Sequence, residues 1–359
     1  MYSIWLEVDA KLLVCQAEKG RDTLSFLSGE FIEIKMSKKR GSLQTSLEYA
    51  LTRGLLSTLG ALPRPAAVAA GRGLGHLAYT LAGGLRRTGM RNLELAFPEI
   101  DEGERRRILR SSFVSLGRQL GEFSHFPRAT PDSIRELVEY DGIEILWEAK
   151  RRGRGIIFLT AHLGAWEILS FAHSALYEPI SFMMRPLDNP RVEEMIEQTR
   201  TRFGNQPIDK KSAARAAMKL LRGGGILGIL ADLNTHPHEG VFVPFFGRMA
   251  CTTGGAAVLA LRTDASVIPV VAPWDEKRGK FVFRGSPILE LVRTGDHQRD
   301  VEINTARFTA AIERQVRAYP DQWLWIHKRW KTRPAGEPDL YSKQPVAQIS
   351  SQTTNENAF

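Results

Sequence analysis

The sequence predicts an α/β fold in which helices flank a mixed sheet, preceded by a helical region. From about residue 140 onward, apolar runs of strand length alternate with helical windows, an alternation typical of helices packed on a sheet. The strand-length runs are 155–160, 180–184, 226–231 and 266–271. The helical windows are 164–176, 190–203, 211–222 and 254–263, and a long helix is expected at 298–318.

A helical, membrane-interface region is expected before the sheet. Residues 43–60 and 66–85 place small and apolar residues on one side, and arginines follow directly. Residues 102–124 form a further basic amphipathic helix. An apolar helix pair bordered by cations is typical of proteins that lie in a membrane interface, although core helices with solvated arginines fit the same pattern. No clean apolar stretch of about 18 residues predicts a spanning helix.

These patterns divide the chain into four segments. Residues 1–42 are expected to be an extension or disordered arm, with Met36 as a plausible native start. Residues 43–125 form the interface helices, and residues 126–333 form the α/β domain that carries the chemistry. The tail 334–359 is rich in Ser, Gln, Thr and Asn and is expected to be disordered.

Composition narrows the function classes. The 359 residues are 43% hydrophobic and 25% charged, which fits a globular protein and excludes a mainly disordered or fibrous chain. The two cysteines, Cys15 and Cys251, cannot form a disulfide framework. A net charge of +9 favours acidic partners, and nucleic acid, an anionic membrane or an acidic protein all remain open.

The segment Gly155-Ile-Ile-Phe-Leu-Thr-Ala-His-Leu-Gly-Ala-Trp-Glu carries the first candidate catalytic pair. His162 follows an apolar strand directly, and Glu167 lies five residues later. The pair can meet if His162 sits on the turn and Glu167 in the first helical turn. Glu167 would then hold one ring nitrogen of His162 and leave the other as a general base. A helix-capping acid beside a structural histidine is the competing interpretation.

Two more strand ends carry candidate substrate contacts. Arg185 can clamp phosphate, and Asn189 is expected to cap the helix that begins at Pro190. Asp232 ends the strand 226–231, and the apolar, aromatic segment 240–247 that follows is expected to wall an alkyl pocket. Ordinary turn and core residues would fit both patterns.

The other sequence features mainly disfavour particular functions, namely metal binding, nucleotide binding and serine hydrolysis. His236 and His238 lack a zinc-binding signature, so no metal is predicted. No P-loop and no nucleophile elbow occurs, which disfavours nucleotide binding and serine hydrolysis. The segment 321–331 interleaves Trp with cations such as Arg329, which suits a headgroup-level surface, a phosphorylated ligand or stacking on nucleic acid.

The ordered set of these segments resembles the lipid A biosynthesis acyltransferases, the late lauroyl and myristoyl acyltransferases of the H-x4-D/E, glycerolipid acyltransferase-like superfamily. The resemblance covers about residues 50–333. It rests on segments that occur in the same order as the family's motifs. These are residues 92–98, the His162–Glu167 segment, Arg185-Pro186 with Asn189-Pro190, Asp232 with residues 241–247, residues 252–254 with 267–269, and the Trp-rich segment 321–331. The family usually has Asn at Ala165 and often has Gln at Leu233.

The resemblance implies transfer of a fatty acyl group from an acyl thioester, carried by acyl carrier protein or coenzyme A, to a lipid hydroxyl. His162 would be the base, Glu167 would steady it, and amides near Gly164 would stabilise the oxyanion. Arg185, Asn189, Asp232 and Arg329 would bind the phosphorylated glycolipid acceptor. No cofactor is implied. The expected location is the cytoplasmic face of the inner membrane.

Three alternatives remain open. A related acyltransferase would use a glycerophospholipid or another glycolipid as acceptor. A basic nucleic-acid-binding protein would explain the net charge and the Trp/Arg cluster, but it leaves the strand-end histidine and acid unexplained. A catalytically inactive membrane scaffold would not depend on His162.

Overall fold

The computed structural model describes residues 41–183, 187–208 and 213–342. The expectations for residues 1–40, for Arg185 and for residues 343–359 lie outside the described residues. Residues 334–342, where the tail is expected to begin, pack against the fold: Leu340 is buried and its carbonyl accepts a hydrogen bond from Nε of Arg91 at 2.7 Å. No helix among the described residues is both long and apolar enough to cross a bilayer.

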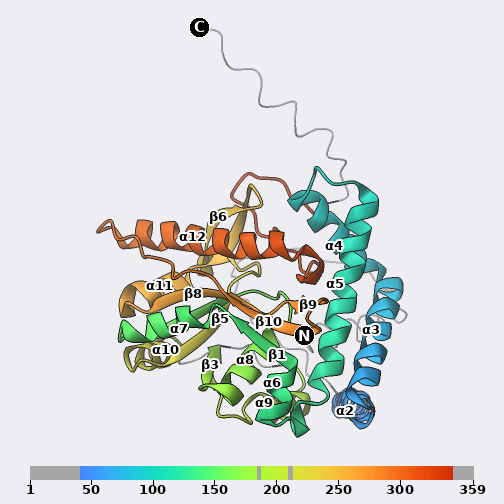
Figure 1. Ribbon diagram of the computed structural model, residues 1–359. Helices are drawn as coiled ribbons and strands as arrows, with labels where there is room; N and C mark the ends of the chain where they lie inside the picture. Colours follow the sequence, from blue (N-terminus) through green and yellow to red (C-terminus); the bar gives the residue numbers. More distant parts are fainter. Residues whose placement is uncertain (1–40, 184–186, 209–212, 343–359) are drawn as a thin grey trace.

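A mixed sheet forms the centre of the molecule (Figure 1). Its strands run in the order β1-β10-β8-β2-β5-β3-β4, and β9 pairs with β10. The pairs β10–β8 and β10–β9 are antiparallel, and the other neighbours are parallel. The strands are β1 (Val138–Asp141), β2 (Ile156–Thr160), β3 (Ile180–Met183), β4 (Gln206–Ile208), β5 (Ile226–Leu230), β8 (Ser266–Val271), β9 (Trp274–Asp275) and β10 (Lys280–Gly285).

Helices cover both faces of this sheet. In Figure 1, α12 crosses above the sheet, and α6, α8 and α9 lie below it. The helices that follow residue 125 are α6 (Pro131–Leu137), α7 (Ile143–Arg151), α8 (Trp166–Leu176), α9 (Pro190–Arg200), α10 (Ala213–Arg222), α11 (Gly255–Thr263) and α12 (His297–Ala318), with one-turn helices η1 (Phe126–Arg128), η2 (Pro237–Glu239) and η3 (Pro320–Gln322).

The central strands form because their residues are apolar on both faces. Every residue of β2 is buried, as expected for a parallel strand covered by helices on both sides. The predicted α/β fold with a mixed sheet is confirmed, and β2, β3, β5 and β8 lie where the apolar runs predict them. The strands β1, β4, β9 and β10 carry charged or polar residues and were not predicted.

The segment 240–247 was expected to be a pocket-lining loop, and the structure corrects this. It forms β6 (Gly240–Phe245), which pairs antiparallel with β7 (Arg248–Thr253) in a separate two-stranded sheet. Phe245 is fully buried, with its ring centroid 5.7 Å from that of Trp323. Phe245 and Phe246 are therefore core residues rather than parts of an alkyl-pocket wall, whereas Phe242 is only partly buried.

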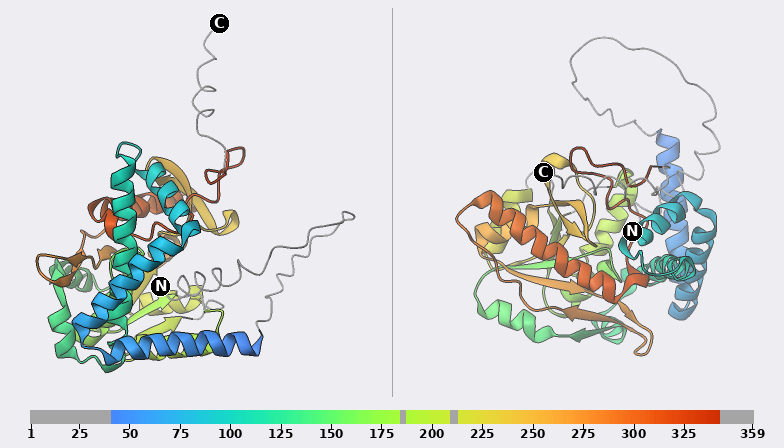
Figure 2. Two further views of the ribbon diagram at one scale, coloured as in Figure 1. Left: turned by 90° about the vertical axis from the view of Figure 1, so that its right-hand side faces the viewer. Right: turned by 90° about the horizontal axis from the view of Figure 1, so that it is seen from above.

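Four helices form one side of the molecule (Figure 2): α2 (Ser42–Ala61), α3 (Arg64–Leu81), α4 (Gly83–Ala96) and α5 (Glu102–Phe123). The sequence predicts α2, α3 and α5 but not α4. Glycines let α3 and α5 approach closely, because a Cβ at Gly71 would lie 2.2 Å from the carbonyl oxygen of Gly117. The helices share one continuous apolar core with the sheet.

Candidate active site

The loop after β2 carries His162 and is held by main-chain pairing. The carbonyl of His162 accepts a hydrogen bond from the N–H of Leu324 at 3.0 Å. Gly164 donates to the carbonyl of Gln322 at 3.0 Å, and Ala165 donates to the carbonyl of Ala272 at 2.8 Å. Gly164 has φ of 59°, and a Cβ there would lie 2.3 Å from the carbonyl oxygen of Ala272, so only glycine fits. The backbone of His162 is therefore fixed from two sides.

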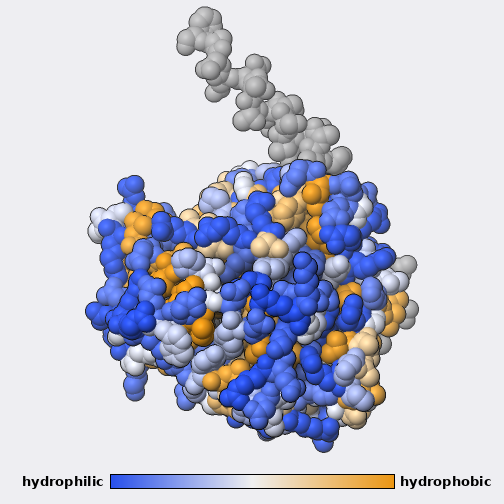
Figure 3. Space-filling model, viewed as in Figure 1, coloured by the Kyte–Doolittle hydropathy of each residue, from blue (hydrophilic) through white to orange (hydrophobic). Residues whose placement is uncertain are grey.

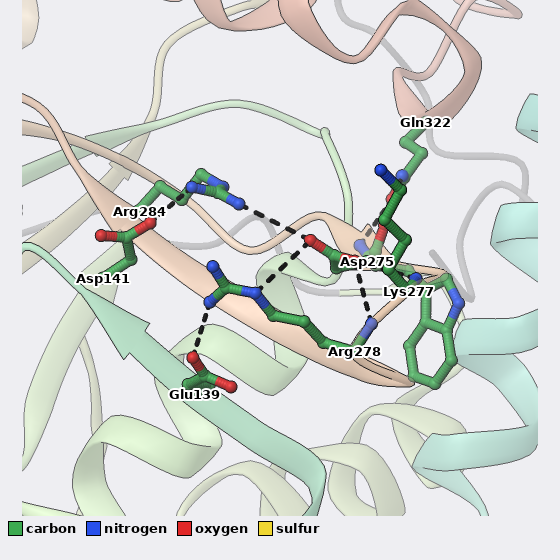
Figure 4. A network of polar contacts seen from close by, with 8 residues as sticks. Glu139, Asp141, Asp275, Lys277, Arg278, Arg284 and Gln322 are labelled. Atoms are coloured by element: carbon green, nitrogen blue, oxygen red, sulfur yellow. Dashed lines mark hydrogen bonds and ion pairs between the residues drawn. The ribbon is translucent and has the colours of Figure 1, made fainter.

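Gln322 connects this loop to the edge of the sheet (Figure 4). Its side-chain amide receives the N–H of Trp274 at 2.8 Å and donates to the carbonyl of Trp274 at 3.0 Å. Beside this clamp, Asp275 lies between Arg278 and Arg284, at 3.7 Å from each. Arg278 and Arg284 also pair with Glu139 and Asp141 of β1. These surface pairs add little stability individually, but together they link β9 and β10 to β1.

Asp232 lies beside His162 because of strand register. β2 and β5 are parallel neighbours, and Thr160 is paired with Leu230. Ala231 extends the pairing by donating its N–H to the carbonyl of Thr160 at 3.1 Å. Two residues further along each chain, His162 and Asp232 meet at the carboxyl edge of the sheet, where α/β proteins commonly place their sites.

The carboxylate of Asp232 orients the imidazole of His162. Nδ1 of His162 lies 2.8 Å from Oδ1 of Asp232. Oδ2 of Asp232 accepts the main-chain N–H of His162 at 2.9 Å and the indole N–H of Trp323 at 2.8 Å. Burial alone would raise the pKa of Asp232, but attraction to His162 and these hydrogen bonds hold the pKa below its ordinary value. An ionised Asp232 accepts Nδ1–H and leaves Nε2 of His162 as the basic nitrogen.

Glu167 occupies a different position from the one expected. His162 lies on the loop and Glu167 in the first turn of α8, as the prediction required, yet Glu167 does not hold the ring of His162. Its carboxylate is clamped by Arg200 of α9 through two bonds, one of them from Nε to Oε2 at 2.9 Å and the other from Nη2 to Oε1. Asp232 already occupies Nδ1, and the guanidinium offers Glu167 a bidentate partner.

This ion pair is buried and is electrically coupled to the site. Burial would raise the pKa of Glu167, but the charge and hydrogen bonds of Arg200 outweigh burial and lower the pKa below its ordinary value. The charge of His162 lowers the pKa of Glu167 further. Glu167 is therefore an anion near His162 without being its hydrogen-bonding partner.

An apolar cavity of about 100 Å³ lies near the His162–Asp232 pair, although neither of these two residues lines it. It lies between α8 and the sheet, and Trp166, Glu167 and Arg200 form part of its wall. The ring of Trp166 also packs edge-on against His162, with centroids 5.1 Å apart. The His162 side chain keeps 12% of its surface exposed, so it remains reachable.

Asn189 serves the fold. As predicted, it caps α9: its Oδ1 accepts the N–H of Arg191 at 3.1 Å and that of Val192 at 3.4 Å. Its Nδ2 donates to the carbonyl of Thr45 at 2.8 Å and to Glu48 at 3.1 Å, which joins α9 to α2. The side chain is buried, so these partners replace the predicted acceptor contact.

Arg329 and the tryptophans around it are also core residues rather than a surface for headgroups. Trp323, Trp325 and Trp330 are fully buried, and so is Arg329. The guanidinium of Arg329 donates to the carbonyl of Cys251 at 2.9 Å and to Oγ1 of Thr252. Burial lowers the pKa of Arg329 to about 10, so it stays charged at neutral pH. Arg329 does not reach solvent, so its predicted role in binding acceptor phosphate stays a prediction that the exposure of this side chain does not support.

Two residues of the site escaped the sequence-based prediction. Trp323 supports Asp232, and Nε2 of His327 accepts the N–H of Asn234 at 3.0 Å just beyond Asp232. Burial lowers the pKa of His327 to about 4, so it is a neutral structural histidine. Trp323 and His327 both lie in the Trp-rich segment 321–331, which the sequence analysis singled out. The sequence pattern alone does not show whether these aromatic residues are buried or exposed.

Two further expectations concern metal and the oxyanion. Across the described ranges, no group of three His, Cys, Asp or Glu residues is placed to hold a metal ion. The amides of Gly164 and Ala165, expected to stabilise an oxyanion, are already bonded to carbonyls. Oxyanion donors must therefore come from elsewhere along the cavity.

Comparison with known proteins gives a consistent set of matches. The sequence profile described as "Bacterial lipid A biosynthesis acyltransferase" matches residues 34–332. A lipid A biosynthesis lauroyltransferase of Escherichia coli K12 is 32% identical over 80% of this chain and 92% of its own length. A lipid A biosynthesis acyltransferase of Haemophilus influenzae is 31% identical over 82% and 93%. A myristoyltransferase of E. coli K12 is 26% identical over 77% and 84%.

Proposed function

Because the chain belongs to the bacterial lipid A biosynthesis acyltransferase family, we propose that it moves a fatty acyl group from an acyl thioester to a hydroxyl group of a lipid A precursor. Membership of that family makes it an acyl-transferring enzyme. The observation that carries the proposal is the His162–Asp232 pair, at 2.8 Å, at the carboxyl edge of the sheet. Trp166, whose ring packs against that of His162, also lines the apolar cavity.

The reaction uses His162 as general base. Nε2 of His162 takes the proton of the acceptor hydroxyl as its oxygen attacks the thioester carbonyl. Asp232 stabilises the imidazolium that forms and keeps the ring in its productive tautomer. The carbon–sulfur bond then breaks, the new carbon–oxygen bond remains, and the proton passes from His162 to the leaving thiolate. The step balances without a covalent acyl-enzyme.

The cavity supplies a place for the acyl chain and a donor for its carbonyl. Thr160 lies at the cavity two residues before His162, and its buried Oγ1 makes no hydrogen bond to any described residue. We assign this hydroxyl to the thioester carbonyl, which becomes negative during attack. Glu167 and Arg200 shape the wall beside it, and a catalytic contribution of Glu167 stays a prediction.

The acceptor is proposed to be a phosphorylated glycolipid and the donor an acyl group on acyl carrier protein or coenzyme A. The excess of Lys and Arg, which gives a net charge of +9, would attract acidic lipid headgroups and an acidic carrier protein. Arg185 stays a predicted phosphate contact.

The direct test is to identify the acylated product. Purified full-length protein is incubated with labelled acyl thioesters, on acyl carrier protein and on coenzyme A separately, and with extracted lipid A precursor or glycerophospholipid. The label should enter the lipid A precursor and not the glycerophospholipid, and a His162→Ala preparation should give none. If the label enters glycerophospholipid alone, the acceptor is a glycerophospholipid and not a lipid A precursor. If the protein transfers no acyl group and instead binds nucleic acid in a salt-sensitive way, the proposed function is wrong.

A stripe of exposed leucines on α2 supports binding at the cytoplasmic face of the inner membrane. Leu43, Leu47, Leu51 and Leu55 recur every four residues and are 85%, 54%, 59% and 39% exposed. Leu77 and Leu81 add exposed apolar surface on α3. Figure 3 shows hydrophobic patches on the side of the molecule where α2 and α3 lie in Figure 1. Leucines spaced by four share one face of a helix, and arginines of α3 and α4 accompany them, as expected for interfacial binding to anionic lipid.

Replacing Leu47 with glutamate should weaken binding to phosphatidylglycerol-containing vesicles about tenfold, because a leucine transferred into the interface is lost and a negative charge is added. Co-sedimentation measures the bound fraction. Ser46→Glu is the matched control: its residue contacts Arg191 (Oγ to Nη1, 3.5 Å) and faces α9, so binding should persist. If both variants bind the vesicles as well as the wild type does, the leucine stripe does not contact the membrane.

A further inference from the structure

Two cavities lie on the same face of the sheet, beneath α8. The proximal cavity is the one lined by Thr160, Trp166, Leu230 and Phe182 among others. The distal cavity, of about 40 Å³, lies toward β8 and β10 and is lined by apolar residues such as Ile268, Val270 and Phe283. Phe158 and Leu169 line both cavities, so these two side chains form the partition between them.

Gly228 leaves the floor of the proximal cavity open. Strand register places it in one row between Phe158 of β2 and Phe182 of β3. A Cβ at Gly228 would meet Cγ2 of Ile180 at 3.4 Å and the carbonyl oxygen of Ser181 at 3.8 Å, which are ordinary contacts. The backbone therefore does not require glycine here. What the glycine provides is empty space at the level of the partition.

We propose that Gly228 and the Phe158–Leu169 partition set the length of the acyl chain that the site accepts. This inference rests on the proposed function. Gly228 lets the alkyl chain run along the sheet between Phe158 and Phe182, and the partition stops its end. Neither residue touches the reacting atoms, so they select the donor without taking part in the chemistry.

Strand geometry gives the depth of this path. Phe158 and Thr160 both line the cavity and lie two residues apart on β2, and a strand rises about 3.3 Å per residue, so the depth between them is about 7 Å. An extended polypeptide advances about 3.3–3.6 Å over its three bonds, or about 1.2 Å per bond, and an extended hydrocarbon has the same zigzag form. The depth therefore corresponds to about six carbons of the acyl chain beyond the level of Thr160.

The far side of the partition is unfavourable for an alkyl end. Tyr140 and His173 line the distal cavity, and Oη of Tyr140 and Nε2 of His173 are buried without a hydrogen-bonding partner among the described residues. Such groups favour water over a methyl group. The ring of Phe158 packs edge-on against His173, with centroids 5.2 Å apart, and covers it from the proximal side.

Filling the floor should shorten the preferred donor. Gly228→Val adds two carbons of side-chain reach and should shift the optimum of kcat/KM by about two carbons toward shorter chains, with about fourfold discrimination per excluded methylene. Gly228→Ala should shift it less in the same direction. The assay offers the full-length protein a graded series of saturated acyl thioesters in competition, and mass spectrometry reads the chain lengths in the product.

Opening the partition should do the reverse. Phe158→Leu should extend the optimum toward longer chains, and Phe158→Leu with Tyr140→Phe should extend it further, because the orphaned hydroxyl is removed. Phe113→Leu, a buried phenylalanine of α5 that lines neither cavity, is the matched control for core truncation and should leave the chain profile unchanged.

The outcomes separate the two proposals. If the wild type transfers no acyl chain of any length, the proposed function fails. If the wild type transfers acyl groups and the folded Gly228 and Phe158 variants keep its chain profile, the inference about length fails while the function stands. Opposite shifts in the Gly228 and Phe158 variants, measured on proteins whose thermal melting shows a folded state, would support the inference.

Discussion

Replacing Asp232 with asparagine should lower kcat for acyl transfer by about 10³-fold or more while the protein still folds. The side chains have the same shape, so the amide oxygen can still accept the main-chain N–H of His162 or the indole N–H of Trp323. The amide NH2 would donate to Nδ1 of His162, leaving the proton on Nε2. The nitrogen that must accept the acceptor's proton would then already carry one.

The measurement is kcat with saturating donor and acceptor, together with a thermal melt. Asp300→Asn is the matched control, because Asp300 is also buried and accepts two hydrogen bonds, from N–H and Oγ1 of Thr294 at 2.6 and 2.7 Å, away from the site. It should keep kcat near the wild-type value. A folded Asp232→Asn variant that retains kcat within a few-fold would contradict the assignment.

The same geometry predicts that His162 and Asp232 act as one unit. His162→Ala should abolish transfer to the residual level that binding alone supports, and adding Asp232→Asn should cost little more, because an orienting carboxylate has no function without its imidazole. An additive loss in the double variant would mean that Asp232 acts independently, for example by contacting the acceptor as the sequence first suggested.

Sequence patterns predicted the sheet well where strands are buried on both faces. Short, continuous apolar runs predict the strands β2, β5 and β8, because strands covered by helices on both faces are apolar throughout. β10, with Lys280 and Arg284 at its ends, lies near the sheet edge and has no such run. β6 begins at Gly240 and contains Pro244, and both residue types favoured a loop in the sequence, whereas pairing with β7 makes the segment a strand.

The sequence also contained the site but not its pairing. His162 and Asp232 were both singled out as strand-end residues, 70 positions apart. The separation of only five residues in the sequence favoured Glu167 as the partner of His162. In the structure, the parallel pairing of β2 and β5 instead places Asp232 beside His162. Arg200, the partner of Glu167, lies at the end of α9, where an arginine reads as an ordinary solvated residue. The pairing of strands and the packing of helices bring together residues that are far apart in the sequence, so the spacing of nearby residues does not predict these contacts.

The Glu167–Arg200 pair gives the second large expected effect. Arg200→Met should lower the free energy of unfolding by about 3–5 kcal/mol at neutral pH, because it leaves a buried carboxylate without its cation. Glu167→Gln combined with Arg200→Met should cost less than Arg200→Met alone, since no buried charge then remains. Arg106→Met removes an exposed pair with Glu102 and should leave the melting temperature unchanged.

The effect should depend on pH with a definite sign. In the wild type the pKa of Glu167 is lowered on folding, so its contribution is present above the unfolded pKa of about 4.3 and is lost as pH falls through the folded value. In Arg200→Met, burial is no longer opposed and raises the pKa of Glu167, so folding takes up a proton and the variant gains stability as pH falls. Denaturant unfolding at a series of pH values should therefore show the gap between the two proteins closing toward acid. A gap that stays constant with pH would show that lost packing, rather than the uncompensated charge of Glu167, destabilises the variant.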